Sequence, residues 1–203
     1  MDYKTGDILL FCGKRKYDSW LSYFSSFVKF TTNSFVTHIG VILKDPRFLD
    51  TTLKGTYVWE SSWEGTEDPQ DGEIKLGVQI TSLDEIMKKS YNSNQTLLIR
   101  KVNCPENTLS YNKLKKIHEV VYDRPYDICP KDWFDALFRK DNDPQKTERF
   151  WCSALVGYIY TKCGILKEKT DWSILRPSDF SLESENLDFT ENCSLDKSEF
   201  KIN

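Results

Sequence analysis

Short hydrophobic runs dominate the first half of the chain and predict β-strands. Apolar or β-branched stretches bounded by turn residues occur at 5–12, 35–43, 56–63, 74–80 and 96–102. Continuous runs of this length, flanked by Gly, Asn, Asp or Pro, favour buried strands over helices. The pattern therefore predicts five strands in this half of the chain.

Alternation within the second and third runs assigns side chains to the faces of the predicted sheet. In the second run, Val36, His38 and Ile42 fall on one face. In the third run, Val58 and Glu60 fall on one face. A histidine and a carboxylate are thus each expected on a strand among apolar neighbours.

Apolar residues at helical spacing predict helices at 18–30, 109–121, 131–139 and 149–162. A start that resembles a capping box at Ser82 predicts a further short helix between the last two strands. The helix at 149–162 has the strongest pattern. Short strands combined with separate helices indicate an α+β domain.

Length and composition exclude several classes of protein. A chain of 203 residues fits one domain. With 28 basic and 31 acidic residues the net charge is −3, so no basic field exists to hold a nucleic acid, and we expect no such partner. Six cysteines without a Cys-x-x-Cys pair, together with only two histidines, argue against a structural zinc site and, without an export signal, against a disulfide framework. The chain contains no Gly-rich phosphate-binding motif, so we expect no nucleotide cofactor.

The two ends of the chain carry different signals. The apolar run from Ile8 to Cys12 is too short for a signal peptide or a membrane span, so we expect a protein that is not secreted, in the cytoplasm or, if viral, in the virion. Residues 178–203 hold seven acids and two lysines, a local charge of −5. We therefore divide the chain into a folded domain at 1–180 and an acidic tail at 181–203 that wraps around its surface.

Cys152 is the first candidate for chemistry, because it lies in the first turn of the strongest predicted helix. A helix N-terminus carries about half a positive charge and unpaired N–H groups, which lower the pKa of a thiol and can hold an oxyanion. The alternative is a small buried hydrophobe, since Cys152 also lies on the apolar stripe with Leu155, Val156 and Ile159.

A nucleophilic thiol needs a base, and the chain offers two imidazoles. His38 lies on a predicted strand that would fix its ring, whereas His118 lies on a helix among charged residues, so His38 is the better base. Glu60, on a neighbouring strand, is the acid that would orient the imidazole. The alternatives are a half-buried strand histidine and a carboxylate that points into water.

Six short motifs occur in order along the chain, at 6–11, 37–41, 58–61, 125–127, 151–156 and 176–179. Together they resemble the circularly permuted NlpC-like papain-fold hydrolases, in particular the YiiX group, with poxvirus relatives and the lecithin:retinol acyltransferases as more distant kin. The resemblance spans 5–180. It implies a permuted papain-like fold, in which an antiparallel sheet packs against the helix that carries the nucleophilic cysteine.

The resemblance also implies roles for the candidate residues. Cys152 matches the nucleophile, His38 the general base and Glu60 the polar third member of the triad. The sequence Trp-Cys-Ser-Ala at 151–154 favours the amidase and peptidase side of the family. The expected function is therefore a thiol-dependent hydrolase of a peptide or isopeptide amide bond, which requires no metal or cofactor.

Two other functions fit the same residues. The triad can cleave or transfer a lipid acyl ester or thioester, so the expected partner is a peptide or an acyl-containing substrate. A binding module that retains the fold without catalysis is the second alternative. Trp20, Phe24 and Phe27 form an aromatic stripe near basic residues, which fits a core or cleft wall better than a membrane anchor but leaves lipid contact open.

Overall fold

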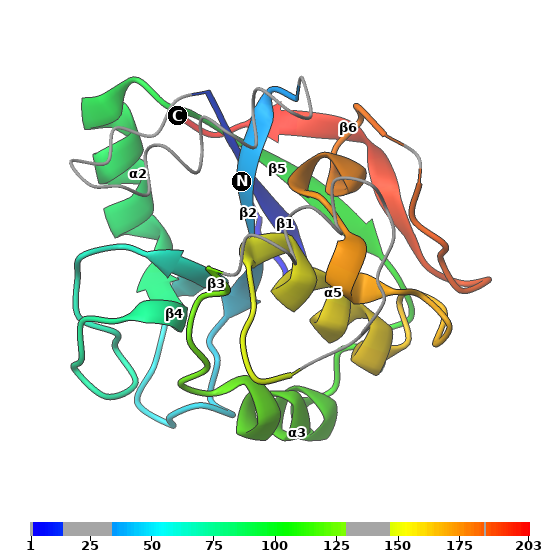
Figure 1. Cartoon of the computed structure of the whole chain (residues 1–203), viewed down its shortest axis with the longest axis horizontal. Helices are drawn as coiled ribbons and strands as arrows, with labels where there is room; N and C mark the ends of the chain where they lie inside the picture. Colours follow the sequence, from blue (N-terminus) through cyan, green and yellow to red (C-terminus); the bar gives the residue numbers. More distant parts are fainter. Residues whose placement is uncertain (1, 14–33, 129–146, 185) are drawn as a thin grey trace.

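A six-stranded antiparallel sheet, in the order β4-β3-β2-β1-β5-β6, organises the computed structural model of the chain (Figure 1). The structure describes residues 2–13, 34–128, 147–184 and 186–203. The strands are β1 (Ile8–Cys12), β2 (Val36–Lys44), β3 (Thr56–Trp63), β4 (Leu76–Ser82), β5 (Thr96–Asn103) and β6 (Ser194–Lys201). The five predicted strands are confirmed with small shifts at their ends, and β6 is additional.

Three α-helices accompany the sheet within the described residues: α2 (Leu83–Ser93), α3 (Tyr111–Val121) and α5 (Cys152–Cys163). Two short 3-10 helices follow, η1 (Trp172–Ile174) and η2 (Pro177–Phe180). The helices expected at 18–30 and 131–139, and with them the aromatic stripe, lie outside the described residues. The predicted α+β class is confirmed.

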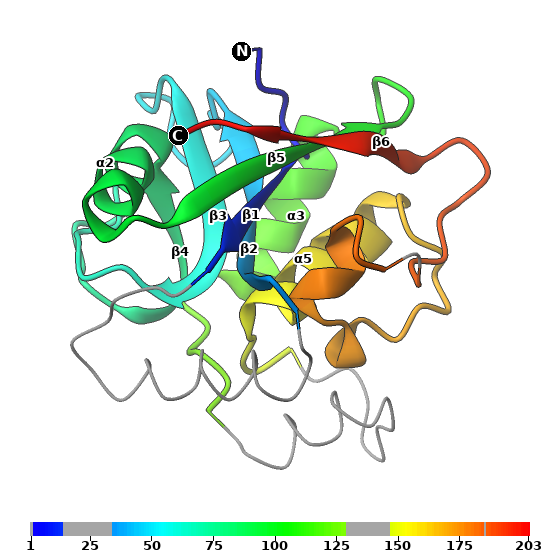
Figure 2. The same ribbon diagram turned by 90° about the horizontal axis from the view of Figure 1, so that it is seen from above.

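The helices divide between the two faces of the sheet (Figure 2). Helices α3 and α5 pack on one face, where they share a core with Leu10, Ile39 and Trp59. Helix α2 packs on the other face, against a smaller core that includes Phe11 and Val58. Apolar burial on both faces stabilises the sheet at roughly 25 cal/mol per Å².

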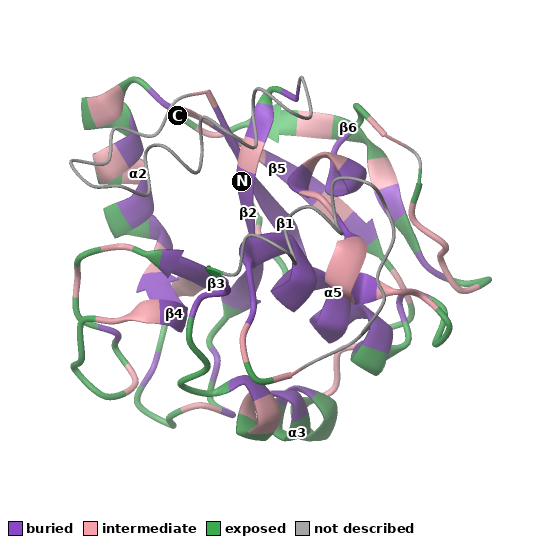
Figure 3. Ribbon diagram, viewed as in Figure 1, coloured by how far each residue is buried: buried purple, intermediate pink, exposed green. Residues whose placement is uncertain are grey.

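Helix α5 is buried nearly all round (Figure 3). Its sequence is apolar on every side, as expected for a helix inside a core. Gly164 ends the helix in the left-handed conformation, with φ of 81°, and its N–H donates to the Thr161 carbonyl. Because α5 contacts β2, β3, α3 and η1, its first residue has a fixed position relative to the sheet.

A β-bulge interrupts the start of β2. The register pairs Phe11 with His38 but Cys12 with Val36, so one extra residue of β2 stands between these pairs. Val36 therefore packs in the core under α5, whereas Ile42 packs in the core under α2. The expectation that Val36 shares a face with His38 and Ile42 is wrong, because simple alternation does not continue through a bulge.

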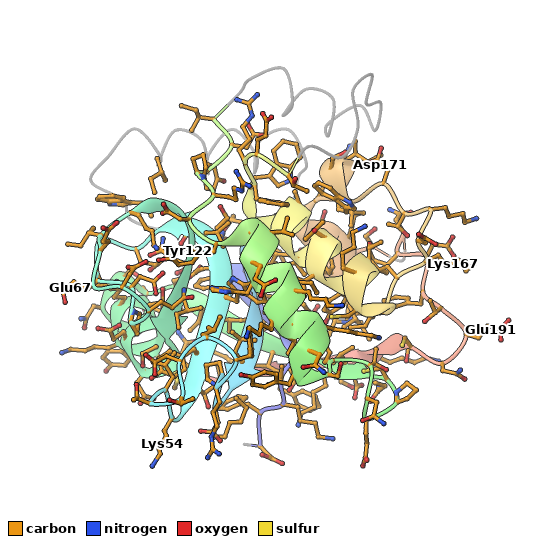
Figure 4. All side chains as sticks on the ribbon, turned by 90° about the horizontal axis from the view of Figure 1, so that it is seen from below. Lys54, Glu67, Tyr122, Lys167, Asp171 and Glu191 are labelled. Carbon is orange, nitrogen blue, oxygen red and sulfur yellow. The ribbon has the colours of Figure 1, made fainter. Side chains whose placement is uncertain are left out.

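The carboxyl-terminal segment contributes a strand. Within the predicted acidic tail, Ser194–Lys201 forms β6 and pairs with β5, where it completes one edge of the sheet. Its two lysines are exposed, its two acids are partly exposed, and Leu195 is its buried anchor. Elsewhere, labelled charged side chains such as Lys54, Glu67 and Glu191 project from the periphery (Figure 4).

Among the described helices, none has the length and apolar character needed to cross a membrane.

Candidate active site

Cys152 is the first residue of α5, and the backbone just before it is held by the sheet. Trp151 is the N-cap, in an extended conformation. The Phe150 carbonyl accepts a hydrogen bond from the Ser61 hydroxyl at 2.7 Å and another from the Asp127 N–H at 3.1 Å. The helix N-terminus that carries the thiol is therefore anchored to β3.

His38 and Glu60 meet from the neighbouring strands β2 and β3. Nε2 of His38 lies 2.6 Å from Oε2 of Glu60, and both side chains are buried. The register pairs Val41 with Trp59, so its continuation places Gly40 opposite Glu60. A Cβ at Gly40 would clash with Cγ1 of Val58 and come 3.2 Å from the Glu60 Cβ, so glycine leaves room for both side chains, and Glu60 reaches diagonally to His38.

The Cys152 thiol contacts His38 and two backbone donors. The His38 side chain forms a hydrogen bond with the thiol, and the N–H groups of Ile39 and Ser153 donate to it. Burial alone raises the pKa of the Cys152 thiol. The charge of His38 and these hydrogen bonds outweigh burial, and they hold this pKa below its ordinary value.

The three residues selected from the sequence form one connected chain of polar groups. Glu60 contacts His38 through Nε2, so Nδ1 is the ring nitrogen that exchanges a proton with Cys152. The His38 ring also packs edge-on against Phe11, with the ring centroids 4.8 Å apart. Packing and the Glu60 contact therefore both fix the imidazole, which is the arrangement that thiol activation needs.

Ser61 is a site residue that the sequence analysis missed. It follows Glu60 on β3, so its side chain points to the opposite face, and there it holds the Phe150 carbonyl. Ser153 makes a second anchor, because its hydroxyl donates to the Leu175 carbonyl at 2.7 Å. A serine in a strand gives no sequence signal for a partner 89 positions away.

The segment that follows α5 braces the start of β2. The Ser34 hydroxyl donates to Oε2 of Glu183 at 2.6 Å, and the Phe35 N–H donates to Oε1 at 2.9 Å. These bonds form just before the bulge that precedes His38. A residue of the predicted tail therefore holds the strand that carries the candidate base.

His118 lies apart from this site, on α3. Its Nε2 lies 2.7 Å from Oε1 of Gln70, and its ring is close to those of Phe48, Trp59 and Tyr122. Burial lowers the pKa of His118. This environment is that of a structural histidine, in agreement with the preference for His38 as the base.

The site contains no set of donors suited to a metal. Among the residues that the structure describes, no group of three or more His, Cys, Asp or Glu side chains is arranged to bind a metal ion. The groups around Cys152 are instead proton donors and acceptors. The chemistry that they can perform is proton transfer and nucleophilic attack by the thiol.

Comparison with known proteins gives no family assignment. No protein-family model matches the chain, and no curated protein matches it. The function is therefore inferred from the geometry of Cys152, His38 and Glu60.

Proposed function

We propose that the protein is a thiol-dependent hydrolase that cleaves an amide bond of a peptide or an isopeptide-linked chain. One observation carries the proposal: the thiol at the N-terminus of α5 contacts an imidazole whose other ring nitrogen contacts a buried carboxylate. This is the nucleophile, base and orienting acid of a catalytic triad, which is recognised by geometry and by roles.

The first half of the reaction forms an acyl-enzyme. His38 accepts the thiol proton, the Cys152 sulfur attacks the substrate carbonyl, and a tetrahedral oxyanion forms. His38 then gives its proton to the leaving amine, the carbon–nitrogen bond breaks, and a thioester remains on Cys152. Glu60 keeps the imidazole in one tautomer and stabilises its charge.

The second half regenerates the thiol. His38 removes a proton from a water molecule, and the hydroxide attacks the thioester carbonyl. The carbon–sulfur bond breaks, the carboxylic acid leaves, and the proton returns to the Cys152 sulfur. The helix N-terminus stabilises the oxyanion in both halves, and we assign the backbone N–H of Cys152 as one donor.

The fold supports the same proposal. Helix α5 packs against the antiparallel sheet, and the His and Glu strands precede the Cys helix in the chain. This order is the one that the resemblance to permuted papain-like hydrolases implies. We therefore propose the permuted papain-like fold as the finer description of the α+β domain.

The test is turnover of a panel of fluorogenic peptide amides, isopeptides and acyl esters by the full chain. We expect amide turnover that falls by about a thousandfold or more in C152A and in H38A. H118Q is the matched control, because it alters the other histidine and leaves the triad in place. We expect it to retain wild-type turnover.

The other outcomes separate the competing functions. Turnover of esters alone, lost in the same two variants, would retain the triad but replace the amide substrate with an acyl ester. Absence of turnover across the panel, together with a Cys152 thiol no more reactive than an ordinary cysteine, would contradict catalysis and favour a binding module.

A further inference from the structure

Two thiols face each other across the far edge of the sheet, away from the candidate triad. Strands β5 and β6 pair Val102 with Leu195 and Asn103 with Ser194. The next pair in this register is Cys104 and Cys193, one position beyond the ends of both strands. Continuation of the register by one position therefore brings these two cysteines opposite each other just past the end of the ladder.

The spacing of opposite residues in an antiparallel sheet allows a disulfide between the two cysteines. The Cys193 N–H donates to the Thr190 carbonyl at 3.1 Å, in the turn that leads into β6. Opposite residues of an antiparallel pair have Cα atoms about 4.5–5.5 Å apart, within the range that a disulfide spans. The alternation of both strands puts Cys104 and Cys193 on the same face as Val102 and Leu195.

The two thiols are neighbours in the reduced protein. The Cys193 thiol lies close enough to Cys104 to act on its charge, it donates a hydrogen bond to the Gly164 carbonyl at 3.9 Å, and both cysteines are free. Cys104 is partly exposed, whereas Cys193 is buried, so an oxidant reaches the pair through Cys104. Burial, and secondarily the neighbouring thiol, raises the pKa of Cys104, so its oxidation is faster at alkaline pH.

We propose that Cys104 and Cys193 are an oxidisable pair that forms a disulfide with a peroxide as the two-electron oxidant. The Cys104 thiolate attacks the peroxide, the O–O bond breaks, and a sulfenic acid and one water molecule form. The Cys193 thiolate then displaces hydroxide from that sulfur, and the hydroxide takes up a proton to give the second water molecule. Two thiols lose two electrons and two protons, and hydrogen peroxide becomes two water molecules.

The disulfide would fasten the carboxyl-terminal strand to the sheet. Strand β6 is an edge strand with a single buried apolar anchor, and the cross-link would close a long loop that contains α3 and α5. Closing a long loop restricts the unfolded chain and so stabilises the folded one. The oxidised protein is therefore expected to resist unfolding at this edge more than the reduced protein does.

The test is treatment of the folded full chain with hydrogen peroxide at about pH 8.5, close to the ordinary pKa of a thiol. Remaining thiols are then blocked under denaturing conditions, and peptides are mapped without reduction. We expect a linked peptide pair that joins Cys104 to Cys193 and is two hydrogen masses lighter than the separate peptides. C104S and C193S should each lose it, whereas C12S, which removes a buried thiol on β1, should keep it.

A second measurement does not depend on peptide recovery. The urea midpoint of wild-type protein should rise on oxidation and return on reduction, and the rise should be absent in C104S. The proposal is overturned if Cys104 and Cys193 remain alkylatable after peroxide treatment. It is also overturned if the linked peptides join Cys104 to Cys163, whose thiol is buried near the same edge. Neither result bears on the triad.

Discussion

At the residue scale, His38 and Glu60 have different roles: His38 transfers protons, and Glu60 positions the imidazole. Both are buried, and their contact at 2.6 Å fixes the ring nitrogen that faces away from the thiol. The proposed mechanism gives Glu60 no proton to transfer. Its role is to position the imidazole, and a neutral side chain of the same shape retains part of that role.

This role predicts that E60Q keeps the fold and partial turnover, because the amide oxygen still accepts the imidazole N–H. C152A and H38A should each remove nearly all turnover, and the double variant should be hardly worse than either, since residues that act as a unit are not additive. The measurement is the steady-state turnover of these four variants with the best substrate of the panel. If E60Q is inactive and H38A is active, the roles of the two residues are reversed.

At the element scale, β3 serves both halves of the site. Glu60 on one face reaches His38, and Ser61 on the other face holds the backbone that leads into α5. The position of the thiol relative to the imidazole therefore depends on a strand that carries neither of them.

This arrangement predicts that S61A lowers both stability and thiol reactivity. Loss of the hydroxyl leaves the Phe150 carbonyl with one fewer partner in a buried site, at a cost of about 1–3 kcal/mol in the free energy of unfolding. Urea unfolding and the pH profile of Cys152 alkylation measure the two effects.

Two variants separate this positioning role from general destabilisation. S61T keeps a hydroxyl and should restore the alkylation profile. S90A removes a buried serine hydroxyl on α2, at the opposite face, and should leave the profile unchanged. A normal profile in S61A would show that the Phe150 anchor does not position the thiol.

The elements that could be predicted are those with local signals. Strand β1 is a continuous apolar run, β2 and β3 are rich in β-branched and aromatic residues, and the apolar sequence of α5 predicts a buried helix. Strand β6 was not predicted because half of its sequence, Ser-Leu-Asp-Lys-Ser-Glu-Phe-Lys, is charged, as is common in exposed edge strands. Its place depends on pairing with β5, a contact far away in the sequence.

The residues of the candidate site likewise divide into those with a local sequence signal and those placed by distant contacts. Cys152, His38 and Glu60 could be selected because each combines a reactive group with a strong local pattern. The bulge that moves Val36 to the other face, and the bonds from Ser61 and Glu183, depend on contacts between distant segments. No periodicity within one segment contains that information.

At the scale of the whole molecule, His118 links stability to pH. Burial lowers its pKa in the folded state, so the unfolded chain binds more protons as the pH falls below about 6.5. The neutral imidazole therefore contributes stability that is present above that pH and is lost as the pH falls toward the lowered folded-state value.

The prediction is that the urea midpoint of wild-type protein falls more steeply than that of H118Q as the pH decreases from about 7.5 to about 5.5. The comparison between the two proteins removes the contribution of groups that they share. Parallel pH profiles would show that His118 does not have a lowered pKa in the folded protein.

The most direct test of the central claim is the rate at which iodoacetamide alkylates Cys152 in the native protein as a function of pH. Because its pKa is lowered, the Cys152 thiolate should persist at about pH 6, where ordinary thiols with pKa near 8.5 react slowly. Cys12, whose pKa burial raises to about 12, is the internal control. We expect selective labelling of Cys152 in wild-type protein and a shift of its profile to higher pH in H38A. Equal labelling of Cys152 and Cys12 at about pH 6, or an unchanged profile in H38A, would contradict an activated cysteine.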